Sequence, residues 1–289
     1  MFRKWEAVIL LSLSIPLYAQ HNTYFPNFFN SYFFSKYHLS PSYIPEDGKL
    51  ELSSNYRALL GELKKISAYS FSSARIFGND STSQKHQLRL SVFNEREGSF
   101  IQSPRGYLGY ALRQRLSEDA FLHSGIQLGA AGIYYSAPTV TQSSAILPDG
   151  SVAVGLTWKK LTLDLSSHQI FNSAQKLILT PLVLQRYYHG YASYTLLLGP
   201  FWKNYTYTLF RILPHVGNEW YLANAFNYKD LFTFGGSFKY RSALSFYVAF
   251  DLIRDRDHIQ LFFNYNSSIF HMSPAWQTGL ELGFNYRMR

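Results

Sequence analysis

A repeated alternation of apolar and polar residues dominates this chain from about residue 49 to its end. In the stretch from Leu244 to Leu252 every second residue is large and apolar, and most residues between them are small or polar. A period of two is the pattern of a β-strand with one apolar and one polar face. Stretches of about ten residues, repeated many times, are typical of a transmembrane β-barrel, whereas the strands of soluble sandwiches usually have about 5–6 residues.

The alternation predicts about fourteen antiparallel strands, and an even number is usual for single-chain bacterial barrels. Their predicted ranges are 49–58, 66–77, 86–95, 104–115, 120–134, 151–159, 161–168, 186–198, 201–212, 218–228, 231–241, 244–254, 258–266 and 276–287. Most of the short connections fall at one end of the strands, and the two longest, near 135–150 and 169–185, fall at the other. Periplasmic turns are short in such barrels, so we expect both chain termini in the periplasm.

Residues 1–19 have the features of a secretory signal peptide. Arg3 and Lys4 precede an apolar run that ends near Leu17, and Ala19 supplies a small residue at a cleavage site. The run is too short to span a membrane, and no other stretch approaches the roughly 20 apolar residues that a spanning helix needs. Membrane crossing is therefore expected through strands alone, which predicts an outer-membrane location of the Gram-negative type.

Residues 20–48 differ in kind from the rest of the chain. They show neither the helical nor the strand period, and prolines such as Pro26 and Pro41 interrupt them. Their many aromatic side chains argue against a disordered linker. We therefore expect an irregular, plug-like segment that folds into the mouth of the barrel or lies beneath it, followed by the barrel over residues 49–289.

The composition excludes several classes of protein. The chain has no cysteine, which rules out a disulfide scaffold, a thiolate metal site and lipoprotein attachment. The formal net charge is +9, but the basic residues are scattered, so we expect no nucleic-acid partner and instead attraction to anionic lipid headgroups of the outer membrane. The chain contains 23 Tyr and 24 Phe at a mean hydropathy of only −0.13, as expected when only alternate residues meet lipid.

The faces of the predicted strands differ in charge. Phe246, Val248, Leu261, Phe263, Leu280 and Leu282 are expected to face lipid. The lumen is expected to receive the polar residues of the opposite faces, namely Glu51, Asn55, Arg57, Arg89, Arg113, Asp164, Lys239, Asp251 and Glu281. An Arg or Lys facing lipid at mid-membrane would cost roughly 2–4 kcal/mol.

One segment requires a test for catalysis, because Ser166, Ser167 and His168 lie together. Adjacent residues of a strand point to opposite faces, which separates Ser167 from His168, and the strand rise places Ser166 and His168 roughly 6.5 Å apart. A nucleophilic hydroxyl needs a base within hydrogen-bond reach. No other histidine shows a close metal-ligand spacing, and we expect no enzyme activity.

Five short segments combine into a recognisable order: Ala19-Gln20, Tyr32-Phe33-Phe34, Leu39-Ser40-Pro41-Ser42-Tyr43, Tyr56-Arg57 and His168-Gln169-Ile170-Phe171-Asn172. In order and spacing they resemble the PorP/SprF family of outer-membrane proteins, which is associated with the type IX secretion system of the Bacteroidota. The chain departs from the family's usual sequence at Ser40, where Asn is usual, and at Ser42, where Ala is usual.

The resemblance implies a barrel that supports secretion or surface anchoring of a specific type IX cargo protein, such as a large adhesin, by binding that protein or its C-terminal domain. Other type IX components are further partners, and no cofactor is implied. The candidate partner-binding residues are Tyr32, Phe33, Pro41, Tyr43, His168 and Asn172. Two alternatives remain open: a channel for small solutes, and a barrel enzyme that acts on lipid.

Overall fold

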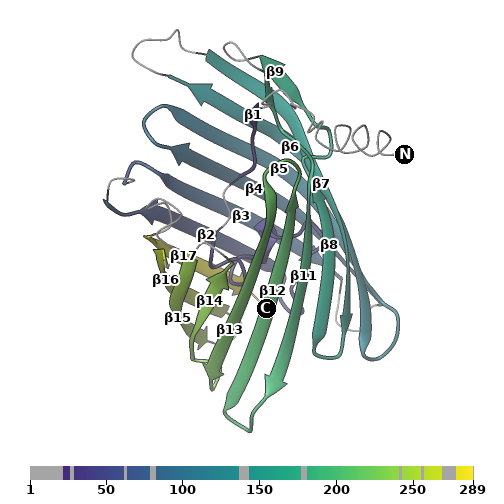
Figure 1. Cartoon of the computed structure of the whole chain (residues 1–289). Coiled ribbons are helices and arrows are strands. Elements are labelled where there is room, and N and C mark those ends of the chain that lie inside the picture. Colours follow the sequence, from purple (N-terminus) through teal and green to yellow (C-terminus); the bar gives the residue numbers. More distant parts are fainter. Residues whose placement is uncertain are drawn as a thin grey trace, which may run out of the picture.

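A computed structural model shows a β-barrel closed around a short N-terminal segment (Figure 1). It describes residues 22–26, 29–61, 64–78, 83–136, 143–176, 181–240, 243–254, 257–268 and 278–288. The predicted signal peptide, residues 1–19, lies outside the described residues. No helix among the described residues is long and apolar enough to cross a membrane.

Fourteen antiparallel strands close the barrel, which confirms the predicted fold class. Their bounds are β2 Leu50–Leu59, β3 Ser67–Phe77, β4 Gln84–Glu97, β5 Ile101–Arg115, β6 Ala120–Tyr135, β7 Ser143–Trp158, β8 Leu161–His168, β11 Tyr187–Leu197, β12 Trp202–Leu213, β13 Gly217–Tyr228, β14 Phe232–Lys239, β15 Ala243–Arg254, β16 Asp257–Ser268 and β17 Gly279–Met288. Neighbours in sequence pair throughout, and the pairing of β17 with β2 closes the ring.

The predicted facing of the strands is confirmed. Phe246, Leu261 and Leu282 are exposed on the outside of the barrel, whereas Glu281 and Arg89 are buried inside it. A slip of one residue would exchange the two faces. Small residues such as Ala223 and Ala249 also point inward, and they leave room in the lumen for the N-terminal segment.

The longest predicted connections are partly wrong. Strand β7 begins at Ser143, so the connection expected over 135–150 is much shorter. Residues 137–142 of that connection lie outside the described part of the chain. The connection expected over 169–185 contains two short strands, β9 (Ala174–Lys176) and β10 (Pro181–Val183). Their three-residue length gives too little alternation for recognition in the sequence.

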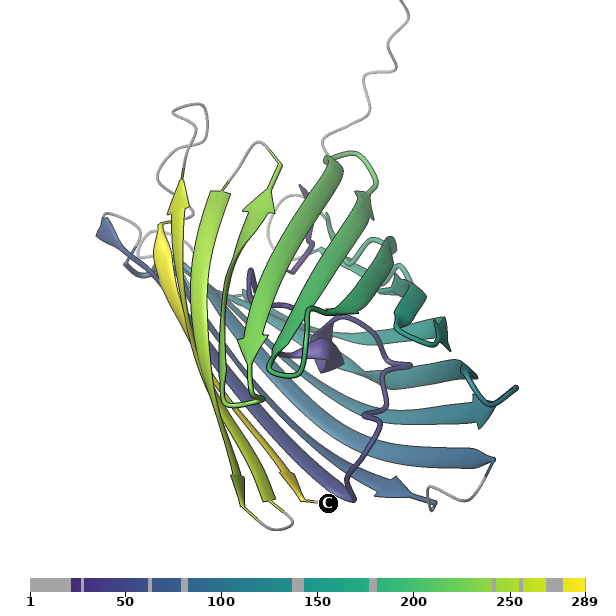
Figure 2. The ribbon, with the colours of Figure 1, turned by 90° about the horizontal axis from the view of Figure 1, so that it is seen from below.

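The N-terminal segment runs through the lumen. It contains strand β1 (Asn22–Thr23) and the 3-10 helix η1 (Lys36–His38), and Figure 2 shows it enclosed by the ring of strands. β1 pairs in parallel with β10 at the rim where β8 ends, whereas Met288 pairs with Leu50 at the opposite rim. The expectation that both ends of the mature chain lie on one side is therefore wrong for the start of the segment, because this segment crosses the barrel.

We call the rim with Met288 and the short turns the inner rim, and the rim with β1, β9 and β10 the outer rim. We call residues 22–48 the plug. A barrel of eight strands is filled by its own side chains, and barrels of 16–18 strands leave a channel. The plug occupies the intermediate space that fourteen strands enclose.

Candidate functional site

The plug joins the barrel at the inner rim through a glycine. Gly48 has φ +106°, a left-handed conformation, and a side chain there would also meet Arg287. The next residue, Lys49, donates its backbone N–H to Met288 O at 2.7 Å. This turn directs the chain from strand β2 back into the lumen, so the rest of the plug is positioned by what the lumen wall offers.

Aromatic side chains fix the middle of the plug against one half of the wall. Tyr32 packs edge-on against Tyr221 with ring centroids 5.9 Å apart. Phe33 stacks on Tyr207 at 5.1 Å, and both plug residues are almost completely buried. Fully burying one such ring is worth about 1.5–3 kcal/mol. These contacts hold the plug against strands β11–β15.

A buried carboxylate on strand β17 anchors the turn before these rings. Glu281 accepts hydrogen bonds from the backbone N–H groups of Asn30 and Ser31, both at 2.9 Å, and from the Ser31 hydroxyl at 2.6 Å. Asn264 and Asn266 donate to the same carboxylate from the wall. Charge-assisted bonds of this kind are the stronger ones in proteins, so Glu281 binds the plug as it would bind a ligand.

A second buried carboxylate, on strand β8, holds the proline corner of the plug. Asp164 Oδ2 accepts the hydroxyl of Ser40 at 2.8 Å and that of Ser42. These two serines are among the positions at which the chain departs from the usual sequence of the resembling family. Both departures therefore supply hydroxyl donors to one lumen carboxylate.

The guanidinium of Arg89 binds the same corner through its backbone. It donates to Tyr37 O at 3.3 Å and to Tyr43 O at 2.9 Å, and it also donates to Ser40 O and Pro41 O. Its central carbon lies 4.2 Å from the centre of the Tyr37 ring. A guanidinium offers five N–H donors in a fixed plane, which suits a turn whose carbonyl groups all point towards Arg89.

Close backbone contact at this corner depends on Gly125 of β6. A Cβ placed there would overlap the carbonyl group of Pro41 and approach Ser42 N to 2.6 Å. Nearer the outer rim, Arg211 donates to Pro26 O at 3.1 Å and Tyr24 donates its hydroxyl to Glu95 at 2.8 Å. The plug is thus bound along its whole described length.

The structure places the candidate partner-binding residues in two groups: one lies in the plug, and the other, His168 and Asn172, lies at the outer end of β8. Tyr32, Phe33 and Pro41 are buried within the barrel, and Tyr43 is half-buried against the wall. In this conformation the three buried residues contact the lumen and no external surface. Their role in partner binding remains a prediction, and it would act through the shape of the plug.

His168 lies at the outer end of β8 in a polar cluster. Its Nδ1 is 3.0 Å from the Ser151 hydroxyl and its Nε2 is 2.9 Å from the Ser166 hydroxyl. The expected separation of Ser166 from His168 is wrong, because their side chains lean together although their backbones are two residues apart. A serine hydroxyl therefore lies within hydrogen-bond distance of each ring nitrogen of His168. The adjoining cavity of about 60 Å³ is too small for a lipid. The absence of catalysis remains a prediction.

Asn172 belongs to a tight corner that leads into β9. Gln169 and Asn172 have φ near +50°, and the Asn172 side-chain oxygen accepts the backbone N–H of Arg186 at 2.7 Å. The bond ties the two ends of the long connection together. Phe171, which lies between Gln169 and Asn172 in the sequence, is exposed, so the corner presents an aromatic ring at the outer rim.

Two cavities lie between the plug and the inner rim. One has a volume of about 380 Å³ and the other of about 500 Å³. Lys36, Tyr43, Tyr205, Tyr207 and Arg287 line both. These shared residues separate two spaces that are each large enough for several water molecules or a small solute.

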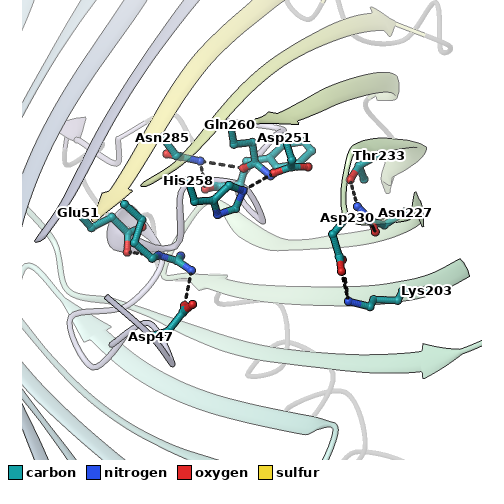
Figure 3. Close-up of polar contacts among 12 residues, drawn as sticks. Asp47, Glu51, Lys203, Asn227, Asp230, Thr233, Asp251, His258, Gln260 and Asn285 are labelled. Carbon is teal, nitrogen blue, oxygen red and sulfur yellow. Dashed lines mark hydrogen bonds and ion pairs between the residues drawn. The ribbon is translucent and has the colours of Figure 1, made fainter. Parts of the chain in front are cut away.

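Side chains that line the larger cavity make polar contacts with one another, and Figure 3 shows these contacts. Lys203 contacts both oxygens of Asp230 at 2.7 Å, and His258 lies 2.8 Å from Asp251. Figure 3 also shows the two carboxylates, Asp47 and Glu51, that bind Arg287 at 3.0 and 3.3 Å. The contacts of Lys203 and Arg287 are ion pairs, and those of Arg287 connect strand β17 with the end of the plug and with strand β2.

The barrel, its lipid-facing apolar rows and its bound N-terminal segment define a plugged transmembrane β-barrel of the outer membrane. Residues 23–286 match the family described as type IX secretion system membrane protein PorP/SprF. The chain belongs to this family, and it is a secretion-related outer-membrane barrel. The resemblance seen in the sequence is confirmed.

Solved structures share the fold. A FadL homologue of Pseudomonas aeruginosa superposes with a TM-score of 0.55 at 10% identity, covering 84% of this chain and 90% of that one. The toluene transporter TodX of P. putida gives 0.54 at 10% identity, covering 93% and 95%. The toluene transporter TbuX of Ralstonia pickettii gives 0.50 at 7% identity, covering 84% and 90%. No curated protein matches the chain.

Proposed function

We propose that this barrel binds a secreted type IX cargo protein, or its C-terminal domain, at its outer rim and so supports secretion or surface anchoring of that protein. Family membership supports a role in this system. Other components of the secretion system are the further partners of the proposal. The chain acts in it by binding alone, with no catalysis and no cofactor.

The observation that carries the proposal is the plug. Glu281, Asp164 and Arg89 are buried and bind the plug through many hydrogen bonds. Each bond to a charged group contributes about 1.5–3 kcal/mol net. A lumen filled in this way favours function at the rims over free passage of solutes.

The outer rim carries the proposed docking surface. Phe171 and Asn172 are exposed on the corner after β8, and the sheet formed by β9, β10 and β1 lies beside it. Aromatic side chains are frequent anchors of protein interfaces. In the proposal Asn172 contacts the cargo directly, while His168, Tyr32, Phe33, Pro41 and Tyr43 shape the dock from within.

Co-purification tests the proposal. The tagged barrel is isolated from mildly solubilised outer membranes, and bound proteins are identified by mass spectrometry. We expect a secreted protein that disappears from the cell surface when the barrel is deleted, and we expect Phe171→Ala with Asn172→Ala to release it. Val216→Ala, an exposed residue in another connection of the same rim, is the matched control. Full capture by the double variant would refute the docking site.

A second candidate function is a channel for small solutes. The two inner cavities favour it, and so does the structural similarity to the toluene transporters TodX and TbuX. In that function the plug would move aside to open a path. Solute conductance by the wild-type barrel, together with no co-purified cargo, would replace the first proposal with this one.

A further inference from the structure

Two hairpins of the inner rim carry lysines beside exposed aromatic rings, and a third hairpin lies between them. Lys159 and Lys160 form the turn from β7 to β8, and Lys229 lies in the turn from β13 to β14. The turn from β11 to β12, which ends in Phe201, lies between them. Backbone hydrogen bonds connect the three: Thr195 N–H to Lys160 O at 3.0 Å, and Lys229 N–H to Phe201 O at 2.8 Å.

The turn geometry does not account for lysine at two of these positions. Lys159 has φ 53° and Lys229 has φ 54°. Tight hairpin turns with positive φ favour Asn, Asp or Gly, and a non-glycine residue in this region is strained. What lysine adds at these positions is a positive charge at the edge of the membrane.

The ammonium groups of Lys159 and Lys229 lie beside rings that face lipid, and Lys160 is exposed in the same turn as Lys159. Lys229 Nζ is 4.7 Å from the centre of the Phe201 ring and 5.2 Å from that of Tyr228. Lys159 Nζ is 5.8 Å from the centre of the Trp158 ring. Trp158 and Phe201 are each more than half exposed, at 56% and 52%. Aromatic rings of this kind concentrate at the depth of lipid headgroups.

Neighbouring carboxylates leave most of this charge free. Asp230 is engaged by Lys203 at 2.7 Å, and Asp119 lies 4.0 Å from Lys159 with both side chains well exposed. In the described ranges of the chain, no carboxylate lies within ion-pair distance of Lys160 or Lys229. Exposed pairs such as Lys159–Asp119 contribute little, so the patch remains strongly positive.

We propose that Lys159, Lys160 and Lys229, with Trp158, Phe201 and Trp202, form a binding site for the negatively charged headgroup of a glycerophospholipid in the inner leaflet. The lysines contact the phosphate, and the rings flank the glycerol and upper acyl region. Each basic residue near an anionic surface is worth a factor of roughly five in binding. The site rests on membrane insertion alone and does not depend on cargo binding.

Tryptophan fluorescence in lipid nanodiscs tests the site. Once the predicted signal peptide has been removed, replacing Trp220 and Trp276 by Phe leaves Trp158 and Trp202 as reporters within the patch. The nanodiscs contain phosphatidylcholine with a minor fraction of a second lipid, which is brominated in the upper acyl chain. We expect brominated phosphatidylglycerol to quench several-fold more strongly than brominated phosphatidylcholine.

Lysine variants give the matched comparison. Lys159→Gln, Lys160→Gln and Lys229→Gln together should make the two lipids quench equally, and Lys229→Gln alone should reduce the difference. Lys64→Gln with Lys65→Gln, which removes exposed charge from the other rim, should leave it unchanged. Heat-modifiable gel mobility confirms that each variant is folded.

Two results would overturn the proposal. One is equal quenching by the two brominated lipids in the barrel with all its lysines. The other is loss of the difference on adding inorganic phosphate in place of chloride at constant ionic strength, which would assign the site to free phosphate. Retention of the difference under phosphate supports a lipid headgroup.

Discussion

At the scale of single residues, lumen side chains bind the N-terminal segment through hydrogen bonds, as a binding site holds a ligand. Glu281 is fully buried, yet five hydrogen bonds reach its two oxygens, three from the plug and two from the wall. A buried carboxylate without such partners would be costly. The charge of Glu281 therefore makes the docked position of the plug specific.

Glu281→Gln should loosen the plug. The amide keeps the shape but loses the charge, and its NH₂ group faces donors of the plug. We expect docking to weaken by about 2 kcal/mol, which is roughly a thirty-fold rise in the undocked population. The open probability of the barrel in planar bilayer recordings measures the undocked population. Asp230→Asn, which breaks an inner-rim ion pair away from the plug, should not change it.

His38 should make plug docking sensitive to pH. Burial, and secondarily the charge of Arg89, lowers the pKa of His38 to about 4, whereas a displaced plug would have a histidine pKa near 6.5. The neutral form is thus favoured in the docked state, and docking is fully stable above pH 6.5. It should weaken as the pH falls from 6.5 towards 4, by about 2 kcal/mol between pH 7 and pH 5.

The replacement His38→Phe isolates this effect. His38 Nε2 is buried and has no hydrogen-bond partner among the described residues, and the ring packs near Phe29 and Phe93. Phenylalanine should therefore fit and remove the titration. Channel opening that rises equally on acidification in both proteins would assign the pH response to other groups.

At the scale of elements, the period of two was sufficient to predict all fourteen barrel strands, because each has eight or more residues with one face towards lipid. It could not predict β1, β9 and β10, whose two or three residues carry no period. The sequence also places Glu281 and Asp164 in the lumen, but it could not show that they bind the plug. Those contacts join residues more than a hundred positions apart and depend on how the plug folds.

The facing of β15 gives a direct test of register. Val248 lies midway along this strand with its side chain towards lipid. Val248→Arg should destabilise the barrel by roughly 2–4 kcal/mol, measured by urea unfolding in lipid vesicles. Gln260→Arg, which enters the larger inner cavity beside Asp251, should be mild. Equal effects of the two changes would contradict the assigned register.

The contact of the plug corner with β6 is a test of close packing. Gly125→Ala places a methyl group where Pro41 now lies, and overpacking of this kind costs typically 1–3 kcal/mol. We expect the corner to shift and the plug to become accessible to protease. Gly106→Ala on β5, where a Cβ meets nothing within 4 Å, is the control. Unchanged protease resistance in Gly125→Ala would show that the corner does not need this contact.

At the scale of the whole molecule, the chain crosses its own barrel before the first strand begins. The start of the described plug lies at the outer rim and the end of β17 at the inner rim. Strand β1 is thereby added to the sheet at the outer rim, and the plug fills the lumen. Both consequences support a barrel that presents a surface to a partner over one that is an open pore.

Planar bilayer recording of the wild-type barrel beside a variant that lacks residues 21–44 tests this central claim. Both proteins should insert and show heat-modifiable mobility, because the strands that close the ring are intact. We predict that the wild type is electrically silent at neutral pH and that the variant shows stable open channels. Steady conductance of the wild type equal to that of the variant would contradict a lumen closed by the plug.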